Sequence, residues 1–319
     1  MREFNLNYKA ATTGASFHRS NAYVRGIMGP VGSGKSTTCI VEMFMRSSQQ
    51  AKAPDGKRYT RWLVVRNTYG ELLNTTIKTW DEWFPPNIFG KRTAVAPFKQ
   101  LIEVGDIHME VIFMALDGLD DIQKLKSFEP TGIFYNEARY IPFELVGAAV
   151  GRLGRYPGSK LGGTTWSGII MDTNPPPDTH WWYKMAEERD WLRDPKTGEL
   201  RDDSAISDDM RWEFFKQPSG LSDEAENLEN LMQTPETLLL PLEERRKHGR
   251  RYYERQCMGQ TKEWINVEVH GNYGTVTDGK AVFEGYWDED IHVVPKGINK
   301  MKNGQTIVGL DCSGRNPAA

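Results

Sequence analysis

Residues 29–36 have the pattern of a loop that binds the phosphates of a nucleotide. They read Gly29-Pro30-Val31-Gly32-Ser33-Gly34-Lys35-Ser36 and match Gly-x-x-x-x-Gly-Lys-[Ser/Thr] at every defined position. In such a loop the backbone N–H groups surround the phosphates, the lysine contacts the terminal phosphates and the serine hydroxyl holds Mg²⁺. An apolar run precedes the loop and a helix-compatible stretch follows it, as this motif requires. We therefore expect ATP and Mg²⁺ as cofactors, bound by these eight residues and by Thr37.

A carboxylate at the end of another apolar run is the candidate general base. ATP hydrolysis needs an acidic group that orders Mg²⁺ and polarises the attacking water. The run Ile133-Phe134-Tyr135 leads into Asn136-Glu137. Glu137 is therefore the candidate catalytic residue, with capping of the next helix as the alternative.

Asn136 stands where an aspartate is usual in this motif. An amide can orient a metal-bound water but brings no charge, so we expect Asn136 to reach the metal through water and Ser36 to be the direct ligand. Asp120 and Asp121 are alternative sources of a metal carboxylate, although both fit a solvated loop.

Two further sets of residues could complete the site. Thr173 and Asn174 end a fourth apolar run, where they could sense the terminal phosphate or simply begin a turn, since Asn-Pro favours turns. An arginine often stabilises the transition state of NTPases, and the loop itself contains none. Among Arg139, Arg152 and Arg155, we favour Arg152 as a catalytic residue that projects into a neighbouring subunit. A basic surface turn is the alternative for that arginine.

The elements that position these residues alternate between strands and helices. Four short apolar runs predict buried strands and two amphipathic stretches predict helices, at residues 23–28, 62–66, 133–135 and 168–171 for the strands and 37–47 and 71–84 for the helices. Residues 99–116 alternate around Gly105-Asp106 and predict a hairpin. The pattern favours an α/β fold with a parallel sheet flanked by helices, whose ligands lie beyond the carboxyl ends of the strands.

The composition changes after Pro177 and suggests three parts. We expect an ATPase core over residues 1–179, a small helical lid over 180–265 and a linker with new strands over 266–319. Within the lid, helices are expected near 179–192 and 242–258, with a charged loop over 194–220 between them.

Bulk properties narrow the class of protein. The chain has 319 residues, a net charge of −3 and a pI of about 6.1, so any contact with nucleic acid has to use local basic patches. One such patch, residues 245–255, also contains three glutamates in and around it and fits a salt-bridged, solvated helix equally well. Three dispersed cysteines and the lack of a long apolar run predict a soluble protein of a reducing compartment, without a membrane partner.

The ordered set of motifs resembles the large terminase subunit of tailed bacteriophages, the motor that packages double-stranded DNA into a procapsid. The resemblance rests on the phosphate loop, the Asn-Glu and Thr-Asn-Pro strand ends, the basic lid and the final segment, Ile307-Val308-Gly309-Leu310-Asp311 through Pro317-Ala318-Ala319. It implies a P-loop NTPase core of the ASCE type, a lid and an RNase H-like nuclease domain. It also implies a pentameric ring on the portal protein and a small terminase subunit that recognises the genome. The implied location is the host cytoplasm, transiently at the procapsid portal vertex and not in the mature virion.

The resemblance assigns roles to individual residues. Lys35 and Ser36 match the Walker A pair, Glu137 the Walker B glutamate, and Thr173 and Asn174 the coupling motif. Asp311 matches the first metal-binding carboxylate of the nuclease.

Two departures from the family pattern matter. Asn136 replaces the Walker B aspartate, and only the first nuclease carboxylate is present, so we expect a chain truncated in the nuclease domain that does not cleave DNA.

Two other functions are alternatives to a packaging motor. One is a helicase- or recombinase-like DNA motor, and the other is a nucleotide-switched protein that assembles on DNA or a capsid. A small-molecule kinase has no evident use for the helical lid.

Overall fold

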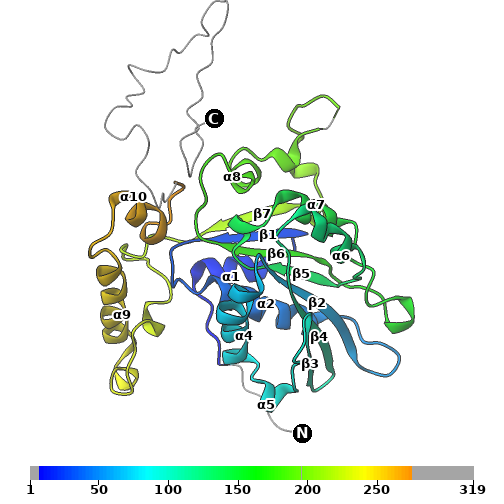
Figure 1. The fold of residues 1–319 in the computed structure, drawn as a ribbon, viewed down its shortest axis with the longest axis horizontal. Helices are drawn as coiled ribbons and strands as arrows, with labels where there is room; N and C mark the ends of the chain where they lie inside the picture. The colour runs from blue at the N-terminus through cyan, green and yellow to red at the C-terminus, as the bar shows by residue number, and fades with distance from the viewer. Residues whose placement is uncertain (1–6, 195, 275–319) are drawn as a thin grey trace, which may run out of the picture. The chain divides into compact units, whose positions relative to one another are not determined.

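The four apolar runs and the predicted hairpin all lie in one seven-stranded sheet (Figure 1). The structure is a computed structural model and describes residues 7–194 and 196–274, which belong to one compact unit. The strands are β1 Val24–Met28, β2 Arg58–Arg66, β3 Phe98–Val104, β4 Ile107–Ala115, β5 Gly132–Tyr135, β6 Gly168–Thr173 and β7 Trp212–Lys216. Their order in the sheet is β3-β4-β2-β5-β6-β1-β7.

All strand pairs except one are parallel. The exception is the β3–β4 hairpin, whose antiparallel pairing confirms the turn predicted at Gly105-Asp106. Because β1, β2, β5 and β6 run in the same direction, their carboxyl ends meet at one edge of the sheet. The predicted α/β class, with a mostly parallel sheet flanked by helices, is confirmed.

Helices cover both faces of this sheet (Figure 1). They are α1 Thr12–Arg19, α2 Lys35–Gln49, α3 Tyr69–Glu71, α4 Ile77–Trp83, α5 Pro86–Phe89, α6 Ile122–Lys126, α7 Phe143–Val150, α8 Trp181–Ala186, α9 Leu242–Gln256 and α10 Lys262–Trp264. Two π-helical turns, Leu72–Thr76 and Ile265–Val269, continue α3 and α10. The helix predicted over 71–84 is thus a continuous run of α3, a π-turn and α4.

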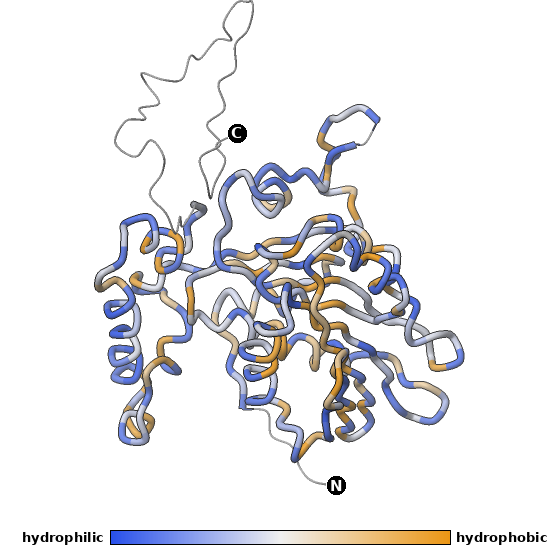
Figure 2. The backbone as a smooth tube through the Cα atoms, in the orientation of Figure 1, coloured by the Kyte–Doolittle hydropathy of each residue, from blue (hydrophilic) through white to orange (hydrophobic). Residues whose placement is uncertain are grey.

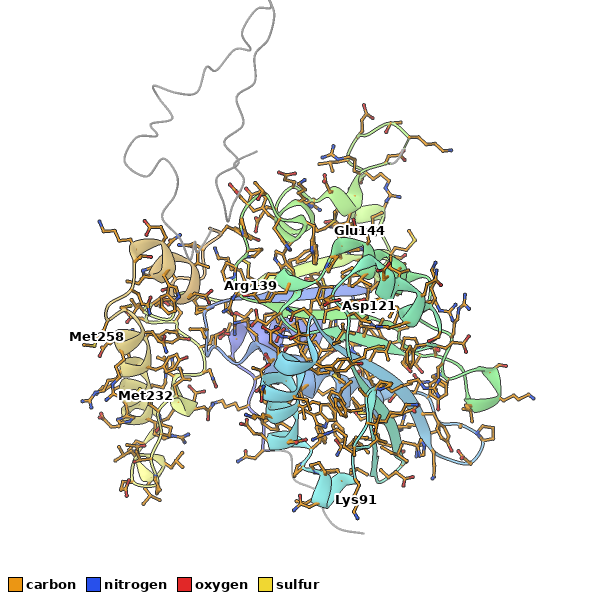
Figure 3. The ribbon with its side chains drawn as sticks, in the orientation of Figure 1. Lys91, Asp121, Arg139, Glu144, Met232 and Met258 are labelled. Atoms are coloured by element: carbon orange, nitrogen blue, oxygen red, sulfur yellow. The ribbon has the colours of Figure 1, made fainter. Side chains whose placement is uncertain are left out.

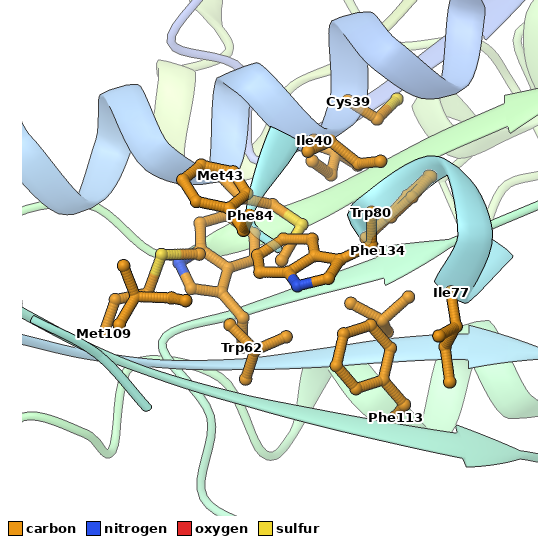
Figure 4. Close-up of a cluster of buried hydrophobic side chains, with 14 of the residues drawn as sticks. Cys39, Ile40, Met43, Trp62, Ile77, Trp80, Phe84, Met109, Phe113 and Phe134 are labelled. Atoms are coloured by element: carbon orange, nitrogen blue, oxygen red, sulfur yellow. The ribbon is translucent and has the colours of Figure 1, made fainter. Parts of the chain in front are cut away.

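Alternate strand residues face opposite cores. Trp62 and Phe134 pack with α2 and α4 on one face, where Figure 4 shows them beside Met43 and Trp80. Leu63, Ile133 and other strand residues pack with α6, α7 and α8 on the other face. Burial on both faces explains why these strands read as continuous apolar runs and not as alternating patterns.

One strand lies where the sequence analysis predicted a loop. Residues Trp212–Lys216 form β7, which pairs in parallel with β1 at the edge of the sheet. The prediction of a loop over 194–220 is therefore wrong at these residues. The strand contains a glutamate and ends on a lysine, and edge strands commonly carry such charges to discourage pairing with other chains.

The segment that follows β7 packs a small core of its own. Ala225, Leu228, Tyr253 and Val269 are buried together, and α9 approaches so closely that a Cβ on Gly249 would lie 1.7 Å from the Leu228 carbonyl oxygen. Figure 2 shows α9 as mainly hydrophilic. None of the helices in the described part of the chain is long and apolar enough to cross a bilayer.

Candidate active site

The phosphate loop joins the end of β1 to the start of α2, as its sequence predicts. Gly32 and Gly34 have φ angles of 77° and 84°, in the left-handed region that glycine adopts without steric cost. Thr37 lies in the first turn of α2, so all nine predicted nucleotide-binding residues are contiguous around the amino end of this helix. Backbone N–H groups at such a helix end favour anions.

Lys35 is buried and points back into its own loop. Its Nζ donates hydrogen bonds to the carbonyl oxygens of Gly29 (3.0 Å) and Pro30 (2.7 Å). Burial lowers the pKa of the ammonium group, although the carboxylates of Glu137 and Asp172 act in the opposite direction. The ammonium group of Lys35 is therefore bound by neutral carbonyl oxygens, which the charged oxygens of a phosphate could replace.

Residues from the C-terminal half of the described chain hold the outside of the loop. The side chains of Gln217 and Asn227 donate to the carbonyl oxygens of Ser33 (3.0 Å) and Gly32 (2.8 Å). The backbone N–H of Val31 donates to the Glu268 carbonyl (2.9 Å). The loop conformation thus depends on the segment after β7.

A buried polar group at the carboxyl ends of β5 and β6 faces the loop. Ser36 Oγ donates to Oδ2 of Asp172, and Asn136 Nδ2 lies 2.9 and 3.0 Å from the two carboxylate oxygens of the same aspartate. The backbone N–H of Glu137 donates to Asp172 Oδ1 (2.7 Å). The predicted residues 36, 136 and 137 are therefore brought together, with Asp172 at their centre.

Asp172 is the residue that the sequence analysis did not select. It lies on β6, is fully buried, and stands between the apolar run Ile169-Ile170-Met171 and Thr173. Burial raises the pKa of its carboxyl group, and the negative charge of Glu137 raises it further. The sequence feature that could have identified Asp172 is its position as a charged residue at the end of an otherwise apolar strand.

A second group of side chains links Glu137 to Thr173 and Asn174. Arg139 Nε lies 3.5 Å from Glu137 Oε2, and Arg139 Nη1 donates to Glu268 Oε1 (2.9 Å). Asn174 Nδ2 donates to the other oxygen of Glu268, and the Arg139 backbone N–H donates to Thr173 Oγ1 (3.2 Å). Burial acts to lower the pKa of Arg139, but the carboxylates of Glu137 and Glu268 raise it. Arg139 is labelled in Figure 3.

Two cavities adjoin the phosphate loop. One of about 130 Å³ is lined by Ser36, Asn136 and Glu137 together with Arg66 from the end of β2. Arg66 is a buried basic group that the sequence analysis missed. The second cavity, of about 590 Å³, lies beside Gly34 and Thr37. Its wall includes the aromatic side chains of Tyr8 and Trp83.

Other predicted residues lie away from this group. Arg152 follows α7, and its Nε donates to the Phe128 carbonyl (3.1 Å) near the amino ends of the strands, at the edge opposite the phosphate loop. Asp121 forms an ion pair with Lys124 (Figure 3 labels Asp121), and Asp120 is exposed. Asp311 and most of the expected segment 266–319 lie outside the described residues.

The basic residues of α9 are largely engaged within the chain. Arg245, Arg246 and Arg250 donate to the carbonyl oxygens of residues 229, 225 and 221. Arg251 is exposed. The helix therefore uses much of its positive charge to hold the preceding loop.

No protein-family model matches this sequence, and no curated protein matches it. Solved structures do match. The large terminase of a thermophilic bacteriophage is 11% identical with a TM-score of 0.57, over 90% of this chain and 59% of that one. The same phage protein in complex with ADP gives 12% identity and a TM-score of 0.56, over 89% and 58%. Its complex with ATP-gamma-S gives 12% and 0.54, over 89% and 57%. The chain thus spans less than two thirds of the length of these proteins, and the likeness shows that it has the fold of phage large terminase structures.

Proposed function

We propose that this chain is the ATP-hydrolysing part of a terminase-like motor that moves double-stranded viral DNA into a procapsid. The observation that carries the proposal is the joining of the phosphate loop, through Ser36 and Asp172, to the strand end that bears Glu137. A phosphate-binding loop alone serves many functions, but a carboxylate positioned opposite it is what hydrolysis requires. The thermophilic phage terminase structures in complex with ADP and with ATP-gamma-S support nucleotide binding by a chain of this fold.

In this proposal the phosphates lie over the N–H groups of residues 29–36. Lys35 exchanges its loop carbonyls for the terminal phosphates, which are stronger acceptors for an ammonium group. The nucleoside occupies the cavity of about 590 Å³, where Trp83 and Tyr8 offer aromatic faces or edges to a base.

The residues present fit Mg²⁺. This ion binds oxygen ligands, keeps several waters and uses one or two carboxylates together with substrate phosphates. Ser36 would supply a hydroxyl directly and Asn136 would act through its amide, while no group of three His, Cys, Asp or Glu side chains in the described residues could hold a metal alone. When bound, the ion would neutralise charge on the phosphates.

Glu137 acts as the general base, and the 130 Å³ cavity that it lines has room for the attacking water. The ion pair with Arg139 holds its carboxylate in place at the strand end. An arginine supplied by a neighbouring subunit, for which we retain Arg152, completes the site.

Thr173 and Asn174 couple hydrolysis to the rest of the chain. Asn174 and Arg139 share Glu268, whose backbone also accepts from the phosphate loop. A change at the carboxyl ends of β5 and β6 would therefore reach the π-helical turn Ile265–Val269 through Glu268.

The wider role is proposed from the fold. Double-stranded DNA, a portal protein and a small terminase subunit would be the partners, and a homo-oligomeric ring the active form. The work would take place in the host cytoplasm at the portal vertex.

Substitution Glu137→Gln tests the hydrolytic function. The amide cannot accept the proton, so we expect ATP turnover to fall by about 100- to 10,000-fold, while binding of a fluorescent ADP analogue stays near that of the unaltered protein. The matched control Glu144→Gln alters an exposed glutamate of α7 that lines neither cavity and should leave turnover unchanged. Retained turnover in the Glu137 variant contradicts the assignment, and turnover that is near zero in the unaltered protein and stays flat with DNA favours a nucleotide-switched assembly protein.

A further inference from the structure

The order of the strands places β6, not β5, next to the phosphate loop. The loop follows β1, β1 pairs with β6, and β5 lies beyond β6. Tyr135 is paired with Met171, so Asn136 and Asp172 follow on adjacent strands. A side chain at the end of β6 therefore reaches the start of α2 more directly than one at the end of β5.

Asp172 is a buried carboxylate on which the positive charge of Lys35 acts without direct contact. Its side chain is 0% exposed and accepts hydrogen bonds from Ser36, Asn136 and the Glu137 backbone. Within residues 7–194 and 196–274 it forms no ion pair. A buried carboxylate is costly unless its charge is compensated by a partner or a metal, and Ser36 is the residue at which the phosphate-loop motif holds its ion.

Asn136 is oriented toward this carboxylate by a second contact. Thr76 Oγ1 donates to Asn136 Oδ1 (2.6 Å), which leaves Asn136 Nδ2 to donate to both oxygens of Asp172. Such outer contacts commonly orient a metal ligand. The amide at position 136 thus holds a carboxylate that comes from the neighbouring strand.

We propose that Asp172 supplies the carboxylate for the divalent cation of the bound nucleotide, and that Asn136 is a positioning residue for it. In the usual motif the acidic residue directly precedes the catalytic glutamate on the same strand. In this chain an amide takes that place and the carboxylate comes from the adjacent strand β6. Glu137 is then free to act as the base. This inference rests on the proposed function and deepens it.

Binding of Mn²⁺, a paramagnetic substitute for Mg²⁺, tests the assignment without relying on activity. The full chain is titrated with Mn²⁺ in the presence of ADP and followed by electron paramagnetic resonance. We expect Asp172→Asn to weaken Mn²⁺ binding by about 10-fold or more, while ADP binding without metal is retained. The control Asp120→Asn, an exposed carboxylate, should behave as the unaltered protein. Unchanged Mn²⁺ affinity in a folded Asp172→Asn variant overturns the proposal.

The double variant Asn136→Asp/Asp172→Asn tests whether the carboxylate can act from either strand. It returns the carboxylate to β5 and puts the amide on β6, so Mn²⁺ affinity should recover most of what Asp172→Asn loses. Affinity that stays at the level of the single variant overturns the inference that Asp172 takes the place of the usual aspartate. The two claims fail in different ways. If the unaltered protein does not bind ADP, the proposed function is wrong. If it binds ADP normally but Asp172→Asn leaves the Mn²⁺ affinity unchanged, only the role of Asp172 is wrong.

Discussion

Glu137 has a backbone conformation that few residues other than glycine adopt. Its φ of 53° and ψ of 61° lie in the left-handed region, which costs a residue with a Cβ about 1 kcal/mol. Its N–H donates to Asp172 and its carbonyl accepts from the Tyr140 N–H (3.0 Å), so the surrounding contacts hold this turn. Strained residues held in this way cluster at functional sites, which agrees with the role proposed for this glutamate.

Trp83 provides a test of where the nucleoside lies. If its indole packs against the base in the larger cavity, Trp83→Ala should weaken ADP binding by about 10-fold, the loss of one aromatic stacking contact. Trp83→Phe retains an aromatic face and should bind ADP nearly as tightly as the unaltered protein. Both affinities can be measured by isothermal titration calorimetry. Equal affinities for the alanine and phenylalanine variants would place the base elsewhere.

Three elements meet at a buried charge cluster behind the phosphate loop. Glu42 of α2 lies 2.6 Å from Arg25 of β1, from Arg46 of α2 and from His18 of α1. Arg25 is fully buried and also donates to the carbonyl oxygens of residues 17 and 20, at the end of α1. The cluster therefore fixes α1 and α2 against the strand that carries the nucleotide loop.

This cluster predicts a loss of stability in acid. Burial alone would raise the pKa of Glu42, but attraction to Arg25, with the contacts to His18 and Arg46, lowers it from 4.5 to about 2. Because the pKa is lower in the folded state, the contribution is complete above about pH 4.5 and is lost as the pH falls toward 2. The shift corresponds to about 3 kcal/mol.

Urea unfolding followed by circular dichroism measures this effect. The free energy of unfolding should fall between about pH 4.5 and pH 2 in the unaltered chain. Glu42→Gln should be less stable at neutral pH and should lose less over the same interval, since it has no carboxylate to protonate. Parallel pH profiles for the two proteins would contradict a major contribution from Glu42.

Assembly is required if Arg152 takes part in hydrolysis. This side chain lies near the amino ends of the strands, whereas the phosphate loop and Glu137 lie at the carboxyl ends, so it cannot reach the nucleotide of its own chain. Two copies must therefore be arranged with the amino edge of one sheet toward the loop of the next. A ring of identical subunits meets this condition at every interface.

Mixing two inactive variants tests this arrangement. Arg152→Ala should lower ATP turnover by about 1,000-fold with unchanged ADP binding, and Lys35→Ala should abolish nucleotide binding. Mixed together, the two variants should recover part of the activity, because some interfaces then combine an intact loop with an intact arginine. Arg155→Ala, an exposed neighbour that shares Glu129, is the control. Mixtures that remain inactive, or a fully active Arg152 variant, would remove the arginine from the mechanism.

Local sequence was sufficient to predict the phosphate loop, the β3–β4 hairpin and most of the buried strands. Each depends on spacing within a few residues: glycines that permit the left-handed turns of the loop, and apolar runs long enough to cross a sheet covered on both faces. It also placed Glu137 and the Thr173-Asn174 pair at strand ends, and the resemblance drawn from these motifs agrees with the fold.

The tertiary structure alone decided which side chains share the site. The order of strands in a sheet cannot be predicted from a local sequence pattern. This order places β6 beside the phosphate loop and brings Asp172 into contact with Ser36. In the same way, β7 joins the sheet because its backbone pairs with β1, and Glu268 reaches Asn174 across 94 positions of sequence. Contacts between distant segments are set by packing of the whole chain, so the sequence motifs could locate the phosphate loop and Glu137 but not Asp172, which contacts both.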